Sequence, residues 1–297
     1  MATAIRSPWD VETSTIPSID APAEAFRWAV SFAILAPSGH NTQPWRFRIA
    51  GDAVEVCADR TRALPVVDPE DRELTIACGA ALLHLRLALE RLGVCPEIDL
   101  LPDGDDADLL ARVRFGPVFP SPPEEDDLFA AVPLRRTNRQ PYDDRPLPTE
   151  LFPALAAAVA AEGAHLRAVE GETRRVVSDL VAGADRSQWA DKHFRRELAL
   201  WLHPARRGDG MHAFARYGLG PVVVRSLDLG KDMGRKDHEL AEEAPLLVVL
   251  GTDGDTPGDW LMAGQALARL LLRARVDAVD AAYLNQPIQV AALRPRL

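Results

Sequence analysis

The chain has 297 residues, a formal net charge of −10 and a hydrophobic fraction of 47%. This length suits one large domain or two ordinary ones, and the acidic balance opposes nonspecific binding to nucleic acid or anionic membranes. No apolar run approaches the roughly 20 residues that cross a bilayer, and the N-terminus has no apolar signal core. The three cysteines lack C-x-x-C spacing, so we expect reduced thiols in a cytoplasmic protein.

The first third of the sequence alternates helical and strand patterns. Residues 1–19 are rich in Thr, Ser and Pro, and we expect them to be irregular. Asp20 can cap a helix that has Pro22 in its first turn, and Pro37 stops that helix. The next predicted elements are a hairpin over 45–58, an apolar helix over 73–92, and strands over 97–101 and 112–115.

The proline-rich stretch 120–123 is the expected boundary between a first half, residues 20–120, and a second half, residues 124–297. Within the second half, residues 185–240 are charged, glycine-punctuated and aromatic, without one clear period. The other predicted elements are a helix opened by Thr149, a strand over 165–169, a helix with Val176, Val177, Leu180 and Val181 as its apolar face, a central strand over 246–250 and a helix over 259–275.

A faint internal repeat links the two long apolar helices. A shift of 185 positions aligns Gly79 with Gly264 and brings several apolar positions into register. Apolar helices match often by chance because leucine is common, so the match alone is weak evidence for duplication, and a glycine near the start of both helices makes it somewhat better than noise. The other matched pairs are Ala81 with Ala266, Leu82 with Leu267, Leu85 with Leu270, Leu87 with Leu272 and Val94 with Val279.

The stretch 36–45 joins the first predicted helix to the hairpin and concentrates short polar residues between two prolines. A helix stop followed by a strand would explain Pro37 and Gly39, but it would not explain Ser38, Asn41 and Gln43. A turn of this composition can bring backbone amides and short polar side chains close to a flat, polar ligand. We therefore interpret it as one wall of a binding site.

A basic segment at residues 135–139 has three arginines in five positions and is bracketed by prolines. A solvated loop is the usual explanation for such a cluster. The intervening Thr137 and Asn138, however, add hydroxyl and amide donors, and the planar guanidinium group suits phosphate oxygens. We therefore favour an anion-binding site.

Both segments resemble motifs of the nitroreductase family, whose members bind FMN. The turn fills every defined position of Pro-Ser-x-x-Asn-x-Gln-Pro-Trp, and the basic segment is similar to Arg-Arg-Ser-x-Arg/Lys. The resemblance implies flavin contacts from Pro37, Ser38, Gly39 and Asn41, phosphate contacts from Arg135, Arg136 and Thr137, and an approach of Arg139 to the N1/O2 side of the flavin. A cation at that side would stabilise the negative charge of reduced flavin.

The order of the two motifs is reversed here relative to ordinary nitroreductases, which are symmetric dimers with FMN at the interface. Residues 1–35 hold no arginine motif, and residues 150–240 hold no second Pro-Ser turn. This pattern is similar to the Acg-like branch. It implies an α+β nitroreductase-like fold, internally duplicated as a pseudo-dimer in one chain, with one composite site. We expect a monomer that mimics a dimer, and further oligomerisation is left open.

Three other features bear on the site. In the resembling family, a segment after the last helix approaches one face of the flavin, which implicates Asn285 and Gln286, although an ordinary loop is an equal alternative. Residues 185–240 match the insertion that forms a lid in the Acg-like branch, and a lid would restrict which substrates enter. The histidines lack the i, i+4 spacing of a helical metal pair, so we expect no metal.

The expected function is an FMN-dependent oxidoreductase that moves two electrons from NAD(P)H to a nitro, quinone or similar acceptor. No catalytic side chain is required, because the flavin carries the chemistry.

The alternatives are a non-catalytic, flavin-sequestering, stress-related protein with an occluded site, and a relic that binds no flavin. The family continues into a final strand with a phosphate-binding basic residue, whereas this sequence stops at Leu297, so we expect FMN affinity to be about tenfold to a hundredfold weaker.

Overall fold

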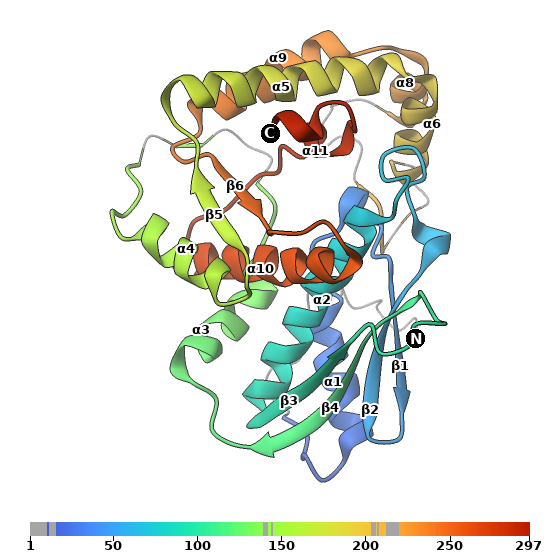
Figure 1. The fold of residues 1–297 in the computed structure, drawn as a ribbon, viewed down its shortest axis with the longest axis vertical. Coiled ribbons are helices and arrows are strands. Elements are labelled where there is room, and N and C mark those ends of the chain that lie inside the picture. The colour runs from blue at the N-terminus through green and yellow to red at the C-terminus, as the bar shows by residue number, and fades with distance from the viewer. Residues whose placement is uncertain are drawn as a thin grey trace, which may run out of the picture.

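The structure is a computed structural model that describes residues 11, 16–138, 142–143, 145–202, 206, 208–211 and 220–297. It mixes helices with antiparallel sheets, which confirms the predicted α+β class. Figure 1 shows the larger sheet at one end of the molecule and a pair of long helices, α5 and α9, at the other. The long helices α2 and α10, of 20 residues each, lie between these ends.

The larger sheet has the strand order β1-β2-β4-β3, with antiparallel neighbours throughout. The predicted hairpin is confirmed: Trp45 pairs with Ala58, and Gly51 takes the left-handed conformation that its turn requires. Helices α1 and α2 pack together, and both contribute to the core under the sheet. The elements of this part are α1 (Pro22–Ala33), β1 (Trp45–Ala50), β2 (Ala53–Ala58), α2 (Arg72–Arg91), β3 (Val94–Leu100) and β4 (Leu109–Val118).

Helix α10 (Pro257–Val276) crosses α2 at the two glycines that the repeat aligned. A Cβ atom on Gly79 would collide with the backbone oxygen of Leu261, and a Cβ atom on Gly264 would collide with that of Ile76. The same shift of 185 relates Ile76 to Leu261. The contact is therefore reciprocal, as in a two-fold interface where the same surface patch is used on both sides.

The correspondence extends to both ends of these helices. Each has 20 residues, and both their first and their last residues differ by 185 in number. Two residues beyond each helix, Gly93 and Ala278 have positive φ angles of 78° and 58°, again at equivalent positions. An alanine in the left-handed region is uncommon, because its Cβ crowds the neighbouring backbone.

The second small sheet pairs β5 (His165–Ala168) with β6 (Val248–Gly251) in antiparallel register. The prediction of a buried central strand over 246–250 is wrong: β6 is only half-buried, and among the described residues the sheet has two strands. The run is apolar because Leu246 and Leu250 pack against a core formed by α10 and α4 (Leu151–Ala160). Helix α3 (Pro123–Ala131) follows the predicted boundary.

The segment 185–240, called the lid segment below, is largely helical where it is described. Its elements are the end of α5 (Gly171–Ala190), α6 (Lys192–Trp201), α8 (Pro221–Ser226) and α9 (Gly230–Glu243). Helices α5 and α9 lie side by side across the top of Figure 1. Their backbones approach closely because Gly234 faces Ala182, where a Cβ atom would have no room.

Several local predictions need correction. Helix α1 has Ala21 rather than Asp20 at its N-cap, and the helix expected at Thr149 begins at Leu151. Val176 is exposed rather than part of the apolar face of α5. The region expected to be a loop near residue 286 contains a short helix, α11 (Gln286–Gln289).

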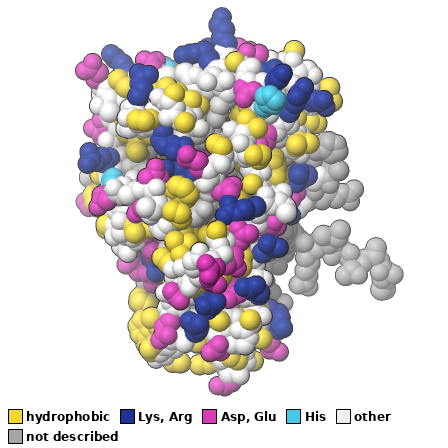
Figure 2. All heavy atoms as spheres, turned by 45° about the vertical axis from the view of Figure 1, so that its right-hand side comes forward, with side chains coloured by type: hydrophobic (Ala, Val, Ile, Leu, Met, Phe, Trp, Pro, Cys, Tyr) yellow, Lys and Arg dark blue, Asp and Glu magenta, His cyan; other side chains and the backbone are white. Residues whose placement is uncertain are grey.

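Charged side chains of both signs are interspersed over the face drawn in Figure 2, without one continuous basic or acidic patch. This distribution suits a chain whose net charge is negative but which carries 34 Lys and Arg residues. Among the described residues, no helix is both long enough and apolar enough to span a bilayer.

Candidate functional site

The basic segment contacts two parts of the chain that are far from it in the sequence. The basic segment lies beside residues 281–286, because Thr137 forms a parallel bridge with Ala281 and the backbone N–H of Asn138 donates to the oxygen of Ala281 at 2.8 Å. Arg135 reaches the end of α1, where its Nη2 atom lies 3.5 Å from the oxygen of Leu35. The predicted turn begins immediately after that residue, at Ala36.

The turn is held in an unusual backbone conformation. His40, Asn41 and Gln43 have φ angles of 48°, 54° and 52°, although none is glycine. Each such residue costs roughly 1–2 kcal/mol, less for asparagine, and strain of this kind often accompanies a functional site. Ser38 stabilises the conformation, because its Oγ accepts a hydrogen bond from the backbone N–H of Gln43 at 2.9 Å.

The polar side chains of the turn bind the lid segment. Asn41 donates through Nδ2 to the oxygen of Gly210 at 2.9 Å, and the N–H of Gly210 donates to the oxygen of Asn41 at 3.0 Å. Gln43 donates to the oxygen of Gly208 at 2.6 Å. Arg62 donates both to the oxygen of Thr42 and to the carboxylate of Asp209. Residues 208–210 therefore cover the turn.

A second contact anchors the lid segment through the buried carboxylate of Glu197 on α6. Its two oxygens accept the backbone N–H groups of Val66 and Val67 at 2.9 and 3.0 Å. Burial raises the pKa of Glu197, and these two hydrogen bonds partly offset that effect. An apolar cluster surrounds the contact, with Leu64 and Val67 from the first half and Trp189, Phe194, Leu198, Trp201, Leu202 and Val224 from the lid segment.

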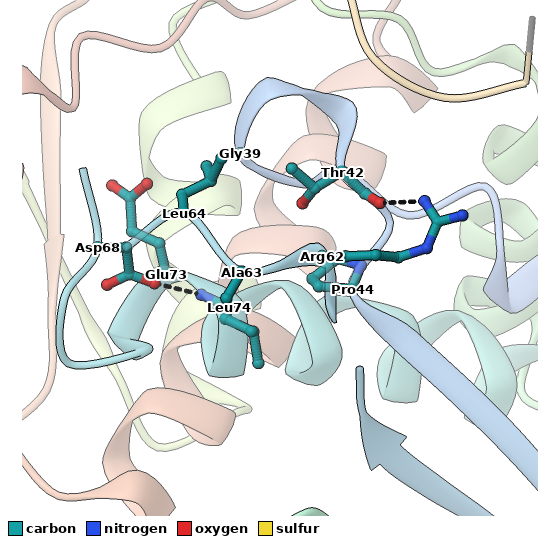
Figure 3. Close-up of a pocket in the computed structure, with 9 residues that line it drawn as sticks. All are labelled: Gly39, Thr42, Pro44, Arg62, Ala63, Leu64, Asp68, Glu73 and Leu74. Carbon is teal, nitrogen blue, oxygen red and sulfur yellow. Dashed lines mark hydrogen bonds between the residues drawn. The ribbon is translucent and has the colours of Figure 1, made fainter. Parts of the chain in front are cut away.

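A cavity of about 10 Å³ lies at the base of the turn (Figure 3). This volume is close to the smallest that holds one water molecule, so the cavity itself has no room for a larger ligand. Figure 3 shows Asp68 and Glu73 on one side of the cavity, and Thr42 and Arg62 on the other. The remaining lining residues are Gly39, Pro44, Ala63, Leu64 and Leu74.

Glu73 connects this cavity to α11 and to the lid segment. Gln289 donates through Nε2 to both carboxylate oxygens of Glu73, at 3.1 and 3.0 Å. The Oε1 atom of Gln289 in turn accepts from Gln188 on α5 at 2.7 Å. Burial raises the pKa of Glu73 to about 7, and the hydrogen bond from Gln289 partly opposes the shift.

Arg135, His84 and Tyr283 form a second buried polar group. Burial, together with the neighbouring charge of Arg135, lowers the pKa of His84 to about 3, so His84 is neutral at pH 7. Burial also raises the pKa of Tyr283 to about 12. The hydroxyl oxygen of Tyr283 is buried, and it has no hydrogen-bond partner among the described residues.

The other predicted site residues differ in exposure. Arg136 is exposed, and its Nη1 donates to the oxygens of Pro133 and Arg135 at 2.8 Å, whereas Thr137 is half-buried. Arg139 lies outside the described residues. Pro37, Ser38 and Gly39 are half-buried in the turn.

Asn285 and Gln286 occupy the start of α11. The backbone oxygen of Asn285 accepts the N–H of Ile288 at 2.9 Å. Gln286 is buried, and its Nε2 donates to Asp237 on α9 at 2.7 Å. In this closed arrangement Gln286 therefore fixes α11 to the lid segment, and its contact with flavin stays a prediction.

Sequence reasoning missed Glu73, Arg62, Glu197 and Tyr283. Glu73 lies in the first turn of an apolar helix, where an acidic residue is ordinary. The spacing of Phe194, Leu198 and Trp201, at i, i+4 and i+7, could have identified α6 and placed Glu197 beside its buried face. No pattern in the sequence could have paired Gln289 with Glu73.

In the ranges that the structure covers, His, Cys, Asp and Glu side chains form no group of three that could hold a metal ion.

Comparison with known proteins identifies relatives over most of the chain. "Putative NAD(P)H nitroreductase Rv3131" of Mycobacterium tuberculosis is 32% identical over 275 residues, which cover 92% of this chain and 79% of the relative. The chain belongs to the nitroreductase family. Two further nitroreductases are more distant. "Putative NAD(P)H nitroreductase acg" of the same organism is 25% identical over 291 residues, 94% of this chain and 85% of the relative. "Probable NAD(P)H nitroreductase PigM" of a Serratia strain is 26% identical over 279 residues, 84% and 76% respectively.

No protein-family model matches this nitroreductase. The predicted resemblance to the family is nevertheless confirmed, and acg is among the relatives found. The relatives add no residue assignments. The site of this nitroreductase is therefore described by its own geometry: a strained turn, a basic segment beside residues 281–286, and a lid segment bound to the turn.

Proposed function

We propose that this nitroreductase is an FMN-dependent oxidoreductase that uses NAD(P)H to reduce a nitro, quinone or similar acceptor. The observation that carries the proposal is that the basic segment contacts both Ala281, through Thr137, and Leu35, the residue that precedes the turn, through Arg135. Three of the relatives carry names that agree with it, two of them "Putative NAD(P)H nitroreductase" and one "Probable NAD(P)H nitroreductase".

The residues present fit FMN in their donor chemistry. An exposed guanidinium and a half-buried hydroxyl, from Arg136 and Thr137, suit a phosphate. The buried hydroxyl of Tyr283 can donate to a ligand oxygen or nitrogen, and such an unpartnered group costs about 1–3 kcal/mol unless a ligand or water satisfies it. Arg139 is proposed for the N1/O2 side, on the resemblance alone.

When bound, FMN supplies the two-electron chemistry between the nicotinamide and the acceptor. The protein residues bind and orient the ligands, and they exclude water. Arg135 remains charged although burial lowers its pKa, and its positive field extends into a poorly solvated region where it acts strongly on a ligand. Residues 208–210 bind the solvent-exposed side of the turn, and these contacts would open when a substrate enters over the turn.

We also propose that the chain is an internally duplicated pseudo-dimer with one composite site. The support is the reciprocal contact of Gly79 and Gly264. In addition, α2 and α10 have the same length, and both their first and their last residues differ by 185 in number. The order helix, strand, strand, helix also recurs, as α1-β1-β2-α2 and as α4-β5-β6-α10. In the second set the lid segment lies between the two strands, which are also antiparallel.

The phosphate assignment is tested with Arg136→Ala, measured by titration with FMN and with riboflavin. Loss of a charged contact should weaken FMN binding by about tenfold to a hundredfold, from roughly 1.5–3 kcal/mol, and leave riboflavin binding unchanged. Arg145→Ala is the matched control, because Arg145 is exposed and is bound to Asp143. Equal FMN affinity in Arg136→Ala and the wild type would refute the assignment.

A second candidate function is flavin sequestration without turnover. The contacts of Asn41 and Gln43 with residues 208–210 favour it, because they close the turn to a reductant. Anaerobic mixing of the flavin-loaded protein with NADPH separates the two functions. Rapid bleaching of the flavin absorbance supports the enzyme, and a flavin that stays oxidised supports sequestration.

A further inference from the structure

The cavity of Figure 3 places an acid beside the predicted ligand turn. Glu73 and Gly39 both line it, and Oε2 of Glu73 lies 3.5 Å from the point where a Cβ atom of Gly39 would stand. Glycine at this position therefore leaves the carboxyl group directly beside the turn. The cavity has the volume of about one water molecule, so a single water can link the carboxyl group to the ligand side of the turn.

The carboxyl group of Glu73 is held in position by its neighbours. Gln289 donates to it from α11, and Gln289 is itself bound to Gln188 of the lid segment. The nearby carboxyl of Asp68 is already committed, because it accepts the backbone N–H of Leu74 at 2.9 Å. Two carboxyl groups line the cavity, those of Asp68 and Glu73. Of the two, it is the carboxyl group of Glu73 that makes no such helix-capping bond.

The charged groups that act on Glu73 are of both signs. Asp68 raises its pKa, whereas Arg72 on α2 and Arg294 near the C-terminus lower it. Burial outweighs all of them, and its effect is the largest. The result is a carboxylic acid that holds its proton close to neutral pH, in a position where a site that consumes protons could use it.

We propose that Glu73 is the proton-supplying residue of this site and acts through one water in the cavity beside Gly39. The proposal rests on the proposed function, because the reduction of a quinone-like acceptor by NAD(P)H consumes one proton. The nicotinamide nucleotide loses a hydride, the acceptor gains that hydride and one proton, and NAD(P)⁺ leaves. The O–H bond of Glu73 breaks, a new O–H bond forms on the acceptor, and the carboxylate regains its proton from solvent.

The first test is the pH profile of turnover in Glu73→Gln. In the wild type, kcat should fall as the pH rises above about 7, because the acid loses its proton. Glu73→Gln should lower kcat by about a hundredfold and remove that inflection, without changing flavin affinity. Glu73→Asp should restore part of the rate and the inflection. Glu70→Gln is the control, because Glu70 is an exposed partner of Arg294.

The second test needs no flavin. The pKa of Glu73 in the folded chain, about 7, lies above its ordinary value of 4.5, so the folded state binds the proton more tightly. The free energy of unfolding should therefore fall as the pH rises from about 4.5 to about 7, and this slope should be smaller in Glu73→Gln. Unfolding in urea at a series of pH values measures it.

The outcomes separate the two proposals. A wild-type chain that binds no flavin overturns the proposed function, and with it the proton role. A Glu73→Gln variant that binds flavin normally, with wild-type kcat and pH profile, overturns the role of Glu73 and leaves the oxidoreductase proposal intact. An unchanged slope of stability in Glu73→Gln also overturns the proton role, because the residue would then not hold the proton near neutrality.

Discussion

Two contacts between the N-terminal and C-terminal parts of this chain differ in kind. At the crossing of α2 and α10, backbone lies against backbone at Gly79 and Gly264, and the contact is apolar and reciprocal. At the lid, Asn41 and Gln43 bind backbone oxygens of residues 208–210 through single hydrogen bonds. The first contact leaves no space for a methyl group, whereas the second can exchange its partners for water.

This difference indicates which part can move during function. An intramolecular hydrogen bond contributes about 0.5–1.5 kcal/mol net, because water replaces it when it opens. Separation of α2 from α10 would instead expose the main core, which contains Leu82, Leu85 and Leu272 among other buried residues. We therefore expect the crossing to stay fixed while residues 208–210 separate from the turn, and the variants below test that expectation in order of effect.

The largest effect is expected from Gly264→Ala. The added methyl group would collide with the backbone oxygen of Ile76, and two packed helices cannot separate cheaply. We expect a loss of about 3 kcal/mol in the free energy of unfolding, in spite of the better helix propensity of alanine. Urea unfolding measures it.

Gly258→Ala on the same helix is the matched control. A Cβ atom there would lie 3.7 Å from Oγ1 of Thr256, an ordinary contact, so we expect a gain of up to about 1 kcal/mol. A Gly264→Ala variant as stable as Gly258→Ala would contradict the close crossing.

A smaller effect is expected from Glu197→Ala, which removes the acceptor of two backbone N–H groups, of which that of Val67 is buried. The loss should be about 2 kcal/mol, and it should appear as faster amide hydrogen exchange at Val66 and Val67. Glu239→Ala removes a surface ion pair with Arg235 instead and should change stability by less than about 0.5 kcal/mol. Unchanged exchange at Val66 and Val67 would show that α6 does not anchor there.

The smallest effect is expected from Asn41→Gly. Glycine loses the side-chain bond to Gly210 but removes the strain of a φ angle of 54°, so the two effects should nearly cancel. Asn41→Ala loses the bond and keeps the strain, and it should cost about 1–2 kcal/mol. Equal stability of the two variants, measured by urea unfolding, would exclude strain at this position.

The elements that depend on local pattern were predictable from the sequence. Alternation and a glycine turn gave the hairpin of β1 and β2, and long apolar periodicity gave α2 and α10. The burial of β6 could not be inferred, because an apolar run of five residues suits a central strand as well as a short strand on a helical core. In the lid segment, the end of α5 is followed by the separate helices α6, α8 and α9, so no single helical period extends through the region.

The site could be predicted only in part. The sequence identified the turn and the basic segment, and the structure brings both toward residues 281–286. It could not indicate that Asn41 and Gln43 bind the lid segment, because that contact joins residues more than 160 positions apart. Glu73 was missed for the same reason, since Gln289, its hydrogen-bond donor, lies on a distant helix.

The central claim, one composite flavin site in a duplicated chain, is tested most directly by the number of FMN molecules bound. Equilibrium dialysis of the purified protein against FMN, with absorbance in the flavin band, gives this ratio. The account predicts one FMN per chain. Two FMN per chain would contradict the single composite site, and no bound FMN at saturating concentration would contradict the flavin site itself.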